Sequence, residues 1–227
     1  MKKIDVYLEN GRKKTFASAV NWPGWSRSGL DEPSALQALS EYGARYADVL
    51  HSTELGFYAP ENPSAFAVVE QLEGNATTDF GAPGMIPSRD SEPVDDELQR
   101  FQELLKACWQ TFDTSARAAV GQELRKGPRG GGRDLEKIVN HVMEADLAYL
   151  RKIGSNFKKG EMINLKNEFR LTRQAILDAL ISAASGELPL YGPRGGLLWP
   201  PRYFVRRVAW HVLDHAWEIE DRMNGGS

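Results

Sequence analysis

The chain has 227 residues, of which 41% are hydrophobic and 26% are charged, and its formal net charge at pH 7 is −3. This composition supplies a hydrophobic core and argues against wholesale disorder, and the slightly acidic balance argues against a dedicated nucleic-acid binder. No apolar run approaches the roughly 18–20 residues that span a bilayer, the first residues do not resemble a signal peptide, and a single cysteine excludes an intramolecular disulfide. We therefore expect a reduced, soluble, cytoplasmic protein.

Residues 1–73 are predicted to form a small α+β unit. Two runs of β-forming residues, 4–8 and 15–20, flank the dipeptide Asn10-Gly11. Asn-Gly between two such runs is typical of a β-hairpin turn. The sequence thus predicts that the chain begins with a hairpin.

A helix and a third strand are expected to follow the hairpin. Apolar residues recur every three to four positions over residues 34–50, which predicts a helix, and residues 66–72 have the composition of a strand. Residues 74–94 contain several Gly, Pro and Ser clusters with little periodicity. We expect this segment to be a linker.

The remainder of the chain, residues 95–227, is predicted to be all-α. Apolar stripes at helical spacing indicate four helices, over residues 95–119, 134–153, 161–184 and 201–223. Helices of about 20 residues suit a four-helix bundle. The expected fold is therefore an α+β N-terminal unit followed by an all-α four-helix bundle, mainly α overall.

Three of the four histidines fall on two of these predicted helices. His211 and His215 are four residues apart, so their side chains project from one face of the last helix, and His141 lies on the core-facing stripe of the second. Two imidazoles at this spacing can bind one ion, as in helical zinc sites. In an up-down-up-down bundle the two helices are parallel, and His141 and His211 then lie at similar depths.

The alternative is that these histidines are hydrogen-bonded core residues, but three together favour a metal site. Val212 stands where a zinc protease has its general-base Glu, so a protease is not indicated. A centre of three imidazoles suits zinc, nickel, iron or copper, with zinc and nickel foremost.

Residues 95–225 resemble the DinB/YfiT-like metalloenzyme superfamily. The similarity rests on HVMEAD, which contains His141, and on HVLDHAWEIEDR, which contains His211 and His215. The resemblance implies a four-helix bundle that holds a divalent ion through these three histidines, and a homodimer. Characterised relatives include thiol S-transferases, so it also implies a low-molecular-weight thiol and a small electrophilic substrate.

The N-terminal unit resembles HicB-like domains in its hairpin, its loop over residues 22–29 and its following helix. Such domains contact proteins or nucleic acids, but no basic cluster here supports a nucleic-acid partner.

Carboxylates close to the histidines are candidates to orient the imidazole rings. Metal-bound imidazoles usually donate their second N–H to a carboxylate or a carbonyl. The candidates are Glu144, Asp214 and Glu218. Each of them could equally be a solvated surface group.

The pentapeptide Gly-Pro-Arg-Gly-Gly occurs twice, before the second and before the fourth predicted helix. If those helices are parallel, Arg129, Arg133 and Arg194 would form an anion-binding rim above the metal. The alternative is a chance match between two loops.

The favoured function is a metal-dependent thiol transfer to a small electrophile. Two alternatives remain open, a non-catalytic metal-binding or sensor module and a metal-dependent hydrolase. Cys108 lies on an apolar helical stripe and is expected to be a buried core residue rather than the nucleophile.

Overall fold

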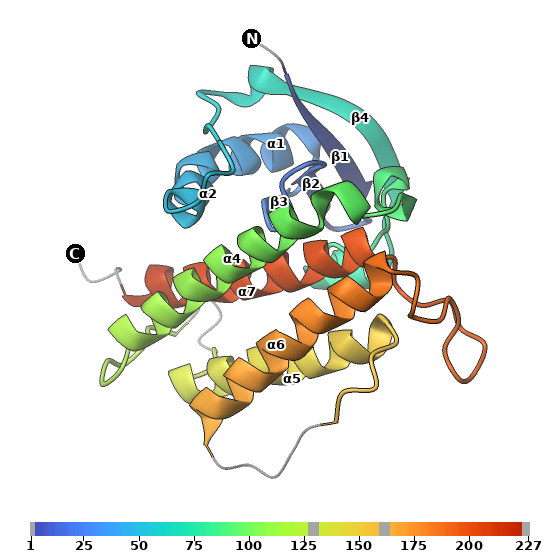
Figure 1. Cartoon of the computed structure of the whole chain (residues 1–227). Coiled ribbons are helices and arrows are strands. Elements are labelled where there is room, and N and C mark those ends of the chain that lie inside the picture. Colours follow the sequence, from blue (N-terminus) through green and yellow to red (C-terminus); the bar gives the residue numbers. More distant parts are fainter. Residues whose placement is uncertain (1–2, 127–131, 159–163, 224–227) are drawn as a thin grey trace. The chain divides into compact units, whose positions relative to one another are not determined.

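The computed structural model describes residues 3–126, 132–158 and 164–223 (Figure 1). The chain forms two compact units, Met1–Glu92 and Pro93–Ser227. Helices and a small sheet together make a mainly α structure with β, as expected. None of the helices in the described segments combines the length and the apolar character needed to cross a membrane.

The N-terminal unit contains a four-stranded sheet in the order β3-β2-β1-β4. The predicted hairpin is present as the antiparallel strands β1 (Ile4–Asn10) and β2 (Thr15–Ala19), and β4 (Phe66–Glu73) pairs in parallel with β1. The sequence did not predict β3 (Ser26–Gly29). Its residues, SRSG, have no β-forming side chain, and backbone pairing with β2 makes them a strand.

The helix predicted over residues 34–50 is two helices, α1 (Glu32–Glu41) and α2 (Gly43–Leu50). The first starts at Glu32, because the Asp31 carboxylate accepts a hydrogen bond from the Ser34 backbone N–H and caps the helix. Tyr42 separates the two helices immediately before a glycine, where helix propensity is low.

The segment 74–94 is not a simple linker, since residues up to Glu92 belong to the N-terminal unit. It contains the short helix α3 (Ala76–Phe80) and a 3-10 turn, η2 (Ser88–Ser91). The fully buried carboxylate of Glu9 accepts hydrogen bonds from the Thr78 hydroxyl and from the backbone N–H groups of Gly84 (2.9 Å) and Met85 (3.0 Å). A buried carboxylate requires such donors, and they fasten the segment to β1.

The second unit contains the four expected long helices. They are α4 (Leu98–Ala118), α5 (Leu135–Lys152), α6 (Leu165–Ala184) and α7 (Pro201–Met223). The first begins three residues later than predicted, because Asp95–Glu97 forms a 3-10 turn, η3. Of the predicted third helix, residues 161–163 lie outside the described part of the chain.

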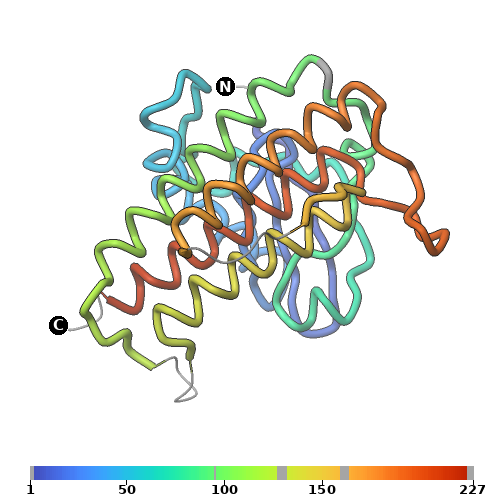
Figure 2. The backbone as a smooth tube through the Cα atoms, turned by 60° about the horizontal axis from the view of Figure 1, so that its bottom comes forward, coloured from blue at the N-terminus to red at the C-terminus, as the bar shows by residue number. Residues whose placement is uncertain are grey.

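The four helices pack pairwise, α4 on α7, α7 on α5, α5 on α6 and α6 on α4 (Figures 1 and 2). Two hydrogen bonds show that α4 and α7 run in the same direction. Near their starts the Arg202 guanidinium donates to the Pro93 carbonyl (3.0 Å), and near their ends the Ser115 hydroxyl donates to Glu220 (2.6 Å).

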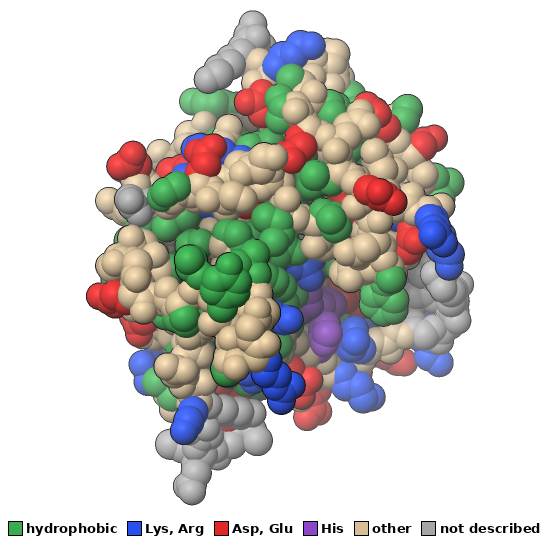
Figure 3. Space-filling model, turned by 90° about the vertical axis from the view of Figure 1, so that its right-hand side faces the viewer, with side chains coloured by type: hydrophobic (Ala, Val, Ile, Leu, Met, Phe, Trp, Pro, Cys, Tyr) green, Lys and Arg blue, Asp and Glu red, His purple; other side chains and the backbone are tan. Residues whose placement is uncertain are grey.

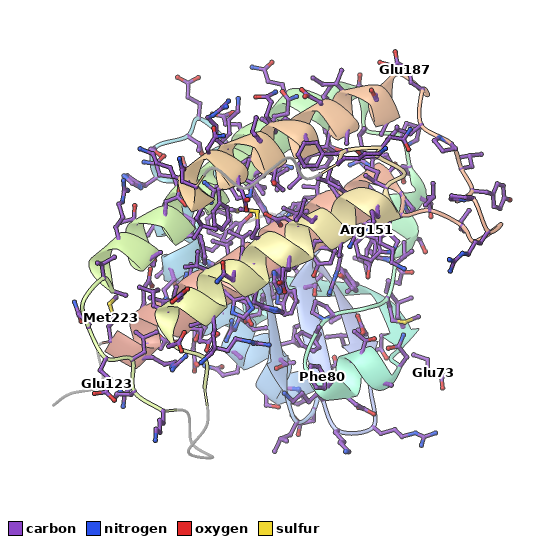
Figure 4. All side chains as sticks on the ribbon, turned by 90° about the horizontal axis from the view of Figure 1, so that it is seen from below. Glu73, Phe80, Glu123, Arg151, Glu187 and Met223 are labelled. Atoms are coloured by element: carbon purple, nitrogen blue, oxygen red, sulfur yellow. The ribbon has the colours of Figure 1, made fainter. Side chains whose placement is uncertain are left out.

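Helices α5 and α7 are antiparallel, which corrects the up-down-up-down expectation. The backbone N–H of Trp199, two residues before the start of α7, donates a hydrogen bond to the carbonyl of Lys152, the last residue of α5 (2.8 Å). At the opposite end, Arg222 near the end of α7 approaches Gly132, just before α5. Figure 4 shows the same relation, with Arg151 and Met223 at opposite ends of the pair.

The reversal arises because α5 and α6 run in the same direction (Figures 1 and 2). The connection between them, residues 153–164, has twelve residues rather than the seven expected from the predicted boundaries. Extended, twelve residues reach about 40 Å, more than the roughly 27 Å length of α5. The chain can therefore return along the whole unit before α6 begins.

Candidate metal centre

The three histidines of α5 and α7 lie together. One ring nitrogen from each of His141, His211 and His215 lies within 4.8 Å of the other two. The Nε2 atoms of His141 and His211 are 3.2 Å apart, and the ring centroids of the three imidazoles are 4.6–5.0 Å from one another. Among the described residues this is the one group with such convergent metal-binding atoms.

The antiparallel packing of α5 and α7 creates this convergence. His141 stands six residues after the start of α5, beside the middle of α7. On α7, His211 and His215 are one turn apart and both are almost fully buried, while His141 is half-buried. The cluster thus lies at the seam of the two helices and is open on one side.

Burial keeps His141 and His211 in the form that binds metals. Removal from water lowers the pKa of His141, and it lowers that of His211 well below the ordinary value. The neighbouring imidazoles and Arg133 act in the same direction on both. His141 and His211 are therefore neutral imidazoles with free lone pairs.

Glu218 fixes the orientation of one ring. Its carboxylate accepts a hydrogen bond from Nδ1 of His215 (2.8 Å) and another from Arg222 (2.8 Å). Burial opposes ionisation of Glu218, but these two hydrogen bonds outweigh it and lower the pKa. With its Nδ1 proton donated to Glu218, His215 turns the Nε2 lone pair toward the other histidines.

The other two predicted orienting carboxylates are placed differently. Glu144 is exposed on α5 and acts on His141 through its charge, which opposes the decrease in the pKa of that histidine. Asp214 is half-buried on α7, next to His215 in the chain. Its role as an orienting group stays a prediction.

Among the described residues, Arg133 and Arg194 of the expected anion-binding rim do not lie together. Arg129 lies outside the described residues. Arg133, just before α5, is close enough to lower the pKa of two histidines, whereas Arg194 belongs to the loop beside the other end of α5, where Gly154 approaches Leu198. Because α5 and α7 are antiparallel, Arg133 and Arg194, which precede them, lie at opposite ends of α5.

Two neighbours of the cluster were not predicted. The Tyr149 ring meets the His211 ring edge-on, with centroids 5.8 Å apart, and the Tyr149 hydroxyl accepts a hydrogen bond from Arg207 (3.3 Å). Burial raises the pKa of Tyr149, so its hydroxyl stays protonated. The spacing signal was available, since Tyr149 follows His141 by eight residues and Arg207 precedes His211 by four.

The donor set fits a first-row divalent ion. Zinc–nitrogen bonds of about 2.0–2.1 Å in a tetrahedron separate two nitrogens by about 3.3 Å, close to the 3.2 Å observed between the Nε2 atoms of His141 and His211. Three protein ligands leave an open position for a ligand from solution. Cys108, in contrast, is fully buried on α4, and burial raises the pKa of its thiol, so it is not a candidate nucleophile.

Histidine side chains reach the molecular surface among Lys and Arg side chains (Figure 3). Within the cluster His141 is half-buried, so a ligand from solution can approach from its side. No family model, no curated protein and no solved structure matches this chain.

Proposed function

We propose that the second unit is a DinB/YfiT-like four-helix bundle that binds one divalent ion through His141, His211 and His215. The observation that carries this proposal is the convergence of three imidazole nitrogens within 4.8 Å. Their burial and the decrease in the pKa of two of them support it, because a neutral imidazole is the ligand form. Zinc and nickel are the ions we favour.

We further propose that the protein is a metal-dependent thiol S-transferase that acts on a small electrophile. A bound divalent ion with an open position lowers the pKa of a thiol or a water that binds there. The residues of this chain would hold the ion and orient its ligands. Neutral histidines leave the charge of the ion undiminished, and Glu218 keeps His215 in the correct tautomer.

For the N-terminal unit we propose a HicB-like role in contacting a protein partner. The hairpin of β1 and β2, the loop over residues 22–29 and the following helix α1 are the features that support this proposal. This proposal concerns that unit by itself.

Metal analysis of the purified protein tests the first proposal. We expect one divalent ion per chain, and loss of most of it in single alanine variants of His141, His211 and His215, with helical circular dichroism retained. His51→Ala is the matched control, because His51 is exposed in the other unit. Metal content that survives all three replacements would refute the site.

Thiol consumption by the metal-loaded protein, with several cellular thiols and generic electrophiles, tests the second proposal. Loss of thiol that requires the bound ion supports the transferase. Hydrolysis of the electrophile without thiol loss would indicate a hydrolase instead. Stoichiometric metal with neither reaction would favour the non-catalytic module.

A further inference from the structure

We propose that Arg207 and Tyr149 form an anion-binding subsite beside the histidine cluster, and that the ligand of the site carries a carboxylate next to its thiol. The inference rests on the proposed function, since it assigns the part of the ligand that the ion does not hold.

The subsite follows from the register of α5 and α7. Arg207 lies one turn before His211 on α7, and Tyr149 lies two turns after His141 on α5. Because the helices are antiparallel, these positions meet, and Arg207 Nη2 donates to the Tyr149 hydroxyl at 3.3 Å. The Tyr149 ring lies against the His211 ring, so the pair adjoins the cluster directly.

The guanidinium is held in place before any ligand arrives. It lies over the rings of Trp210, 5.0 Å from the centroid, and Tyr149, 5.7 Å from the centroid, and the Arg207 residue is almost fully buried. A donor that is already fixed loses little conformational entropy when it binds. The Tyr149 hydroxyl accepts from Arg207, which leaves its own proton for a ligand oxygen.

The local charge favours an anion. Imidazole ligands bring no negative charge to the ion, and both Arg133 and Arg207 act electrostatically on His211. Of the carboxyl groups close by, half-buried Glu218 is paired with Arg222, and buried Asp146, which acts electrostatically on Tyr149, has its pKa raised to about 7. A planar guanidinium beside a hydroxyl matches the two oxygens of a carboxylate, since guanidinium–carboxylate pairs are commonly bidentate.

Two thiols that differ in their charged group provide the test. The Co²⁺-loaded protein is titrated with mercaptoacetate and with 2-mercaptoethanol, and the near-ultraviolet absorption of the thiolate–Co²⁺ bond reports binding of each. The ratio of the two dissociation constants is then compared between parent and variants, which cancels the intrinsic difference between the thiols.

In the parent we expect mercaptoacetate to bind about tenfold more tightly, as for one charged hydrogen-bonded contact. Arg207→Gln should lower the ratio of the two dissociation constants at least about fivefold relative to the parent, and Tyr149→Phe should lower it about threefold. Both variants should retain the Co²⁺ stoichiometry. The matched control is Arg194→Gln, which removes an equal charge from an exposed position in the loop before α7 and should keep the parental ratio.

The outcomes separate the two proposals. If the parent takes up no Co²⁺, the proposed metal site falls, and this inference falls with it. If Co²⁺ binds and the ratio is the same in the parent and in Tyr149→Phe, the inference alone is wrong. Tyr149→Phe removes only one hydroxyl, so it decides the question even if Arg207→Gln fails to fold.

Discussion

The buried carboxyl group of Asp146 should make the protein less stable as the pH rises toward neutrality. Asp146 lies on α5 with none of its surface exposed, and neither carboxylate oxygen has a hydrogen-bond partner within the described residues. Burial raises the pKa of Asp146 to about 7, against a partly compensating effect of the Arg173 charge. An acid whose pKa is higher in the folded state binds its proton more tightly there.

The sign and the size follow from linkage. Below pH 3.8, the ordinary pKa, Asp146 is protonated in both states and the folded protein has its full stability. As the pH rises to about 7, only the unfolded chain releases the proton, and stability falls. Three pH units correspond to about 4 kcal/mol in total, of which about 2–3 kcal/mol falls between pH 5 and pH 8.

Asp146→Asn keeps the shape and removes the titration. We expect the free energy of unfolding of the variant, measured by urea denaturation, to decline by about 2–3 kcal/mol less than that of the parent between pH 5 and pH 8. Titration of other groups cancels in this double difference. Asp178→Asn, an exposed position on α6, is the control and should follow the parent. Parallel curves for the parent and Asp146→Asn would refute the reasoning.

Three further predictions concern the metal centre and assembly. Glu218→Gln should weaken metal affinity about 10–100-fold, because the His215 ring loses its orienting carboxylate, whereas Glu144→Gln at an exposed position should change it much less; a competition titration with a chelator measures both. Removal of the ion with a chelator should lower the melting temperature of the parent but not that of His211→Ala, since only a protein that binds the ion is stabilised by it. Light scattering is expected to give twice the mass of one chain, because the resemblance implies a homodimer. The aromatic stripe of α4 that includes Trp109 is buried and does not supply the contact. A measured mass of one chain would refute the homodimer.

The sequence predicted elements wherever side-chain periodicity decides them. The spacing of apolar residues indicates the helices α4 to α7 and the hairpin of β1 and β2, so their existence was predictable. Strand β3 was not, because its residues have no preference for a strand and only pairing with β2 orders them. Likewise, the donors for buried Glu9 come from a Gly- and Pro-rich segment whose composition indicates only turns.

The same difference explains why the histidine cluster was predictable although the helix directions were not. His211 and His215 share a face of α7 whatever surrounds it, since four residues make about one turn. His141 lies six residues from the start of α5 and His215 lies eight from the end of α7, so the two meet when the helices are antiparallel, at about 9 and 12 Å from the shared end. Residues near the middle of a helix tolerate a reversal of direction in this way. Loops at helix ends do not, and Arg194 is therefore placed far from Arg133, while Arg207, within α7, lies beside the cluster.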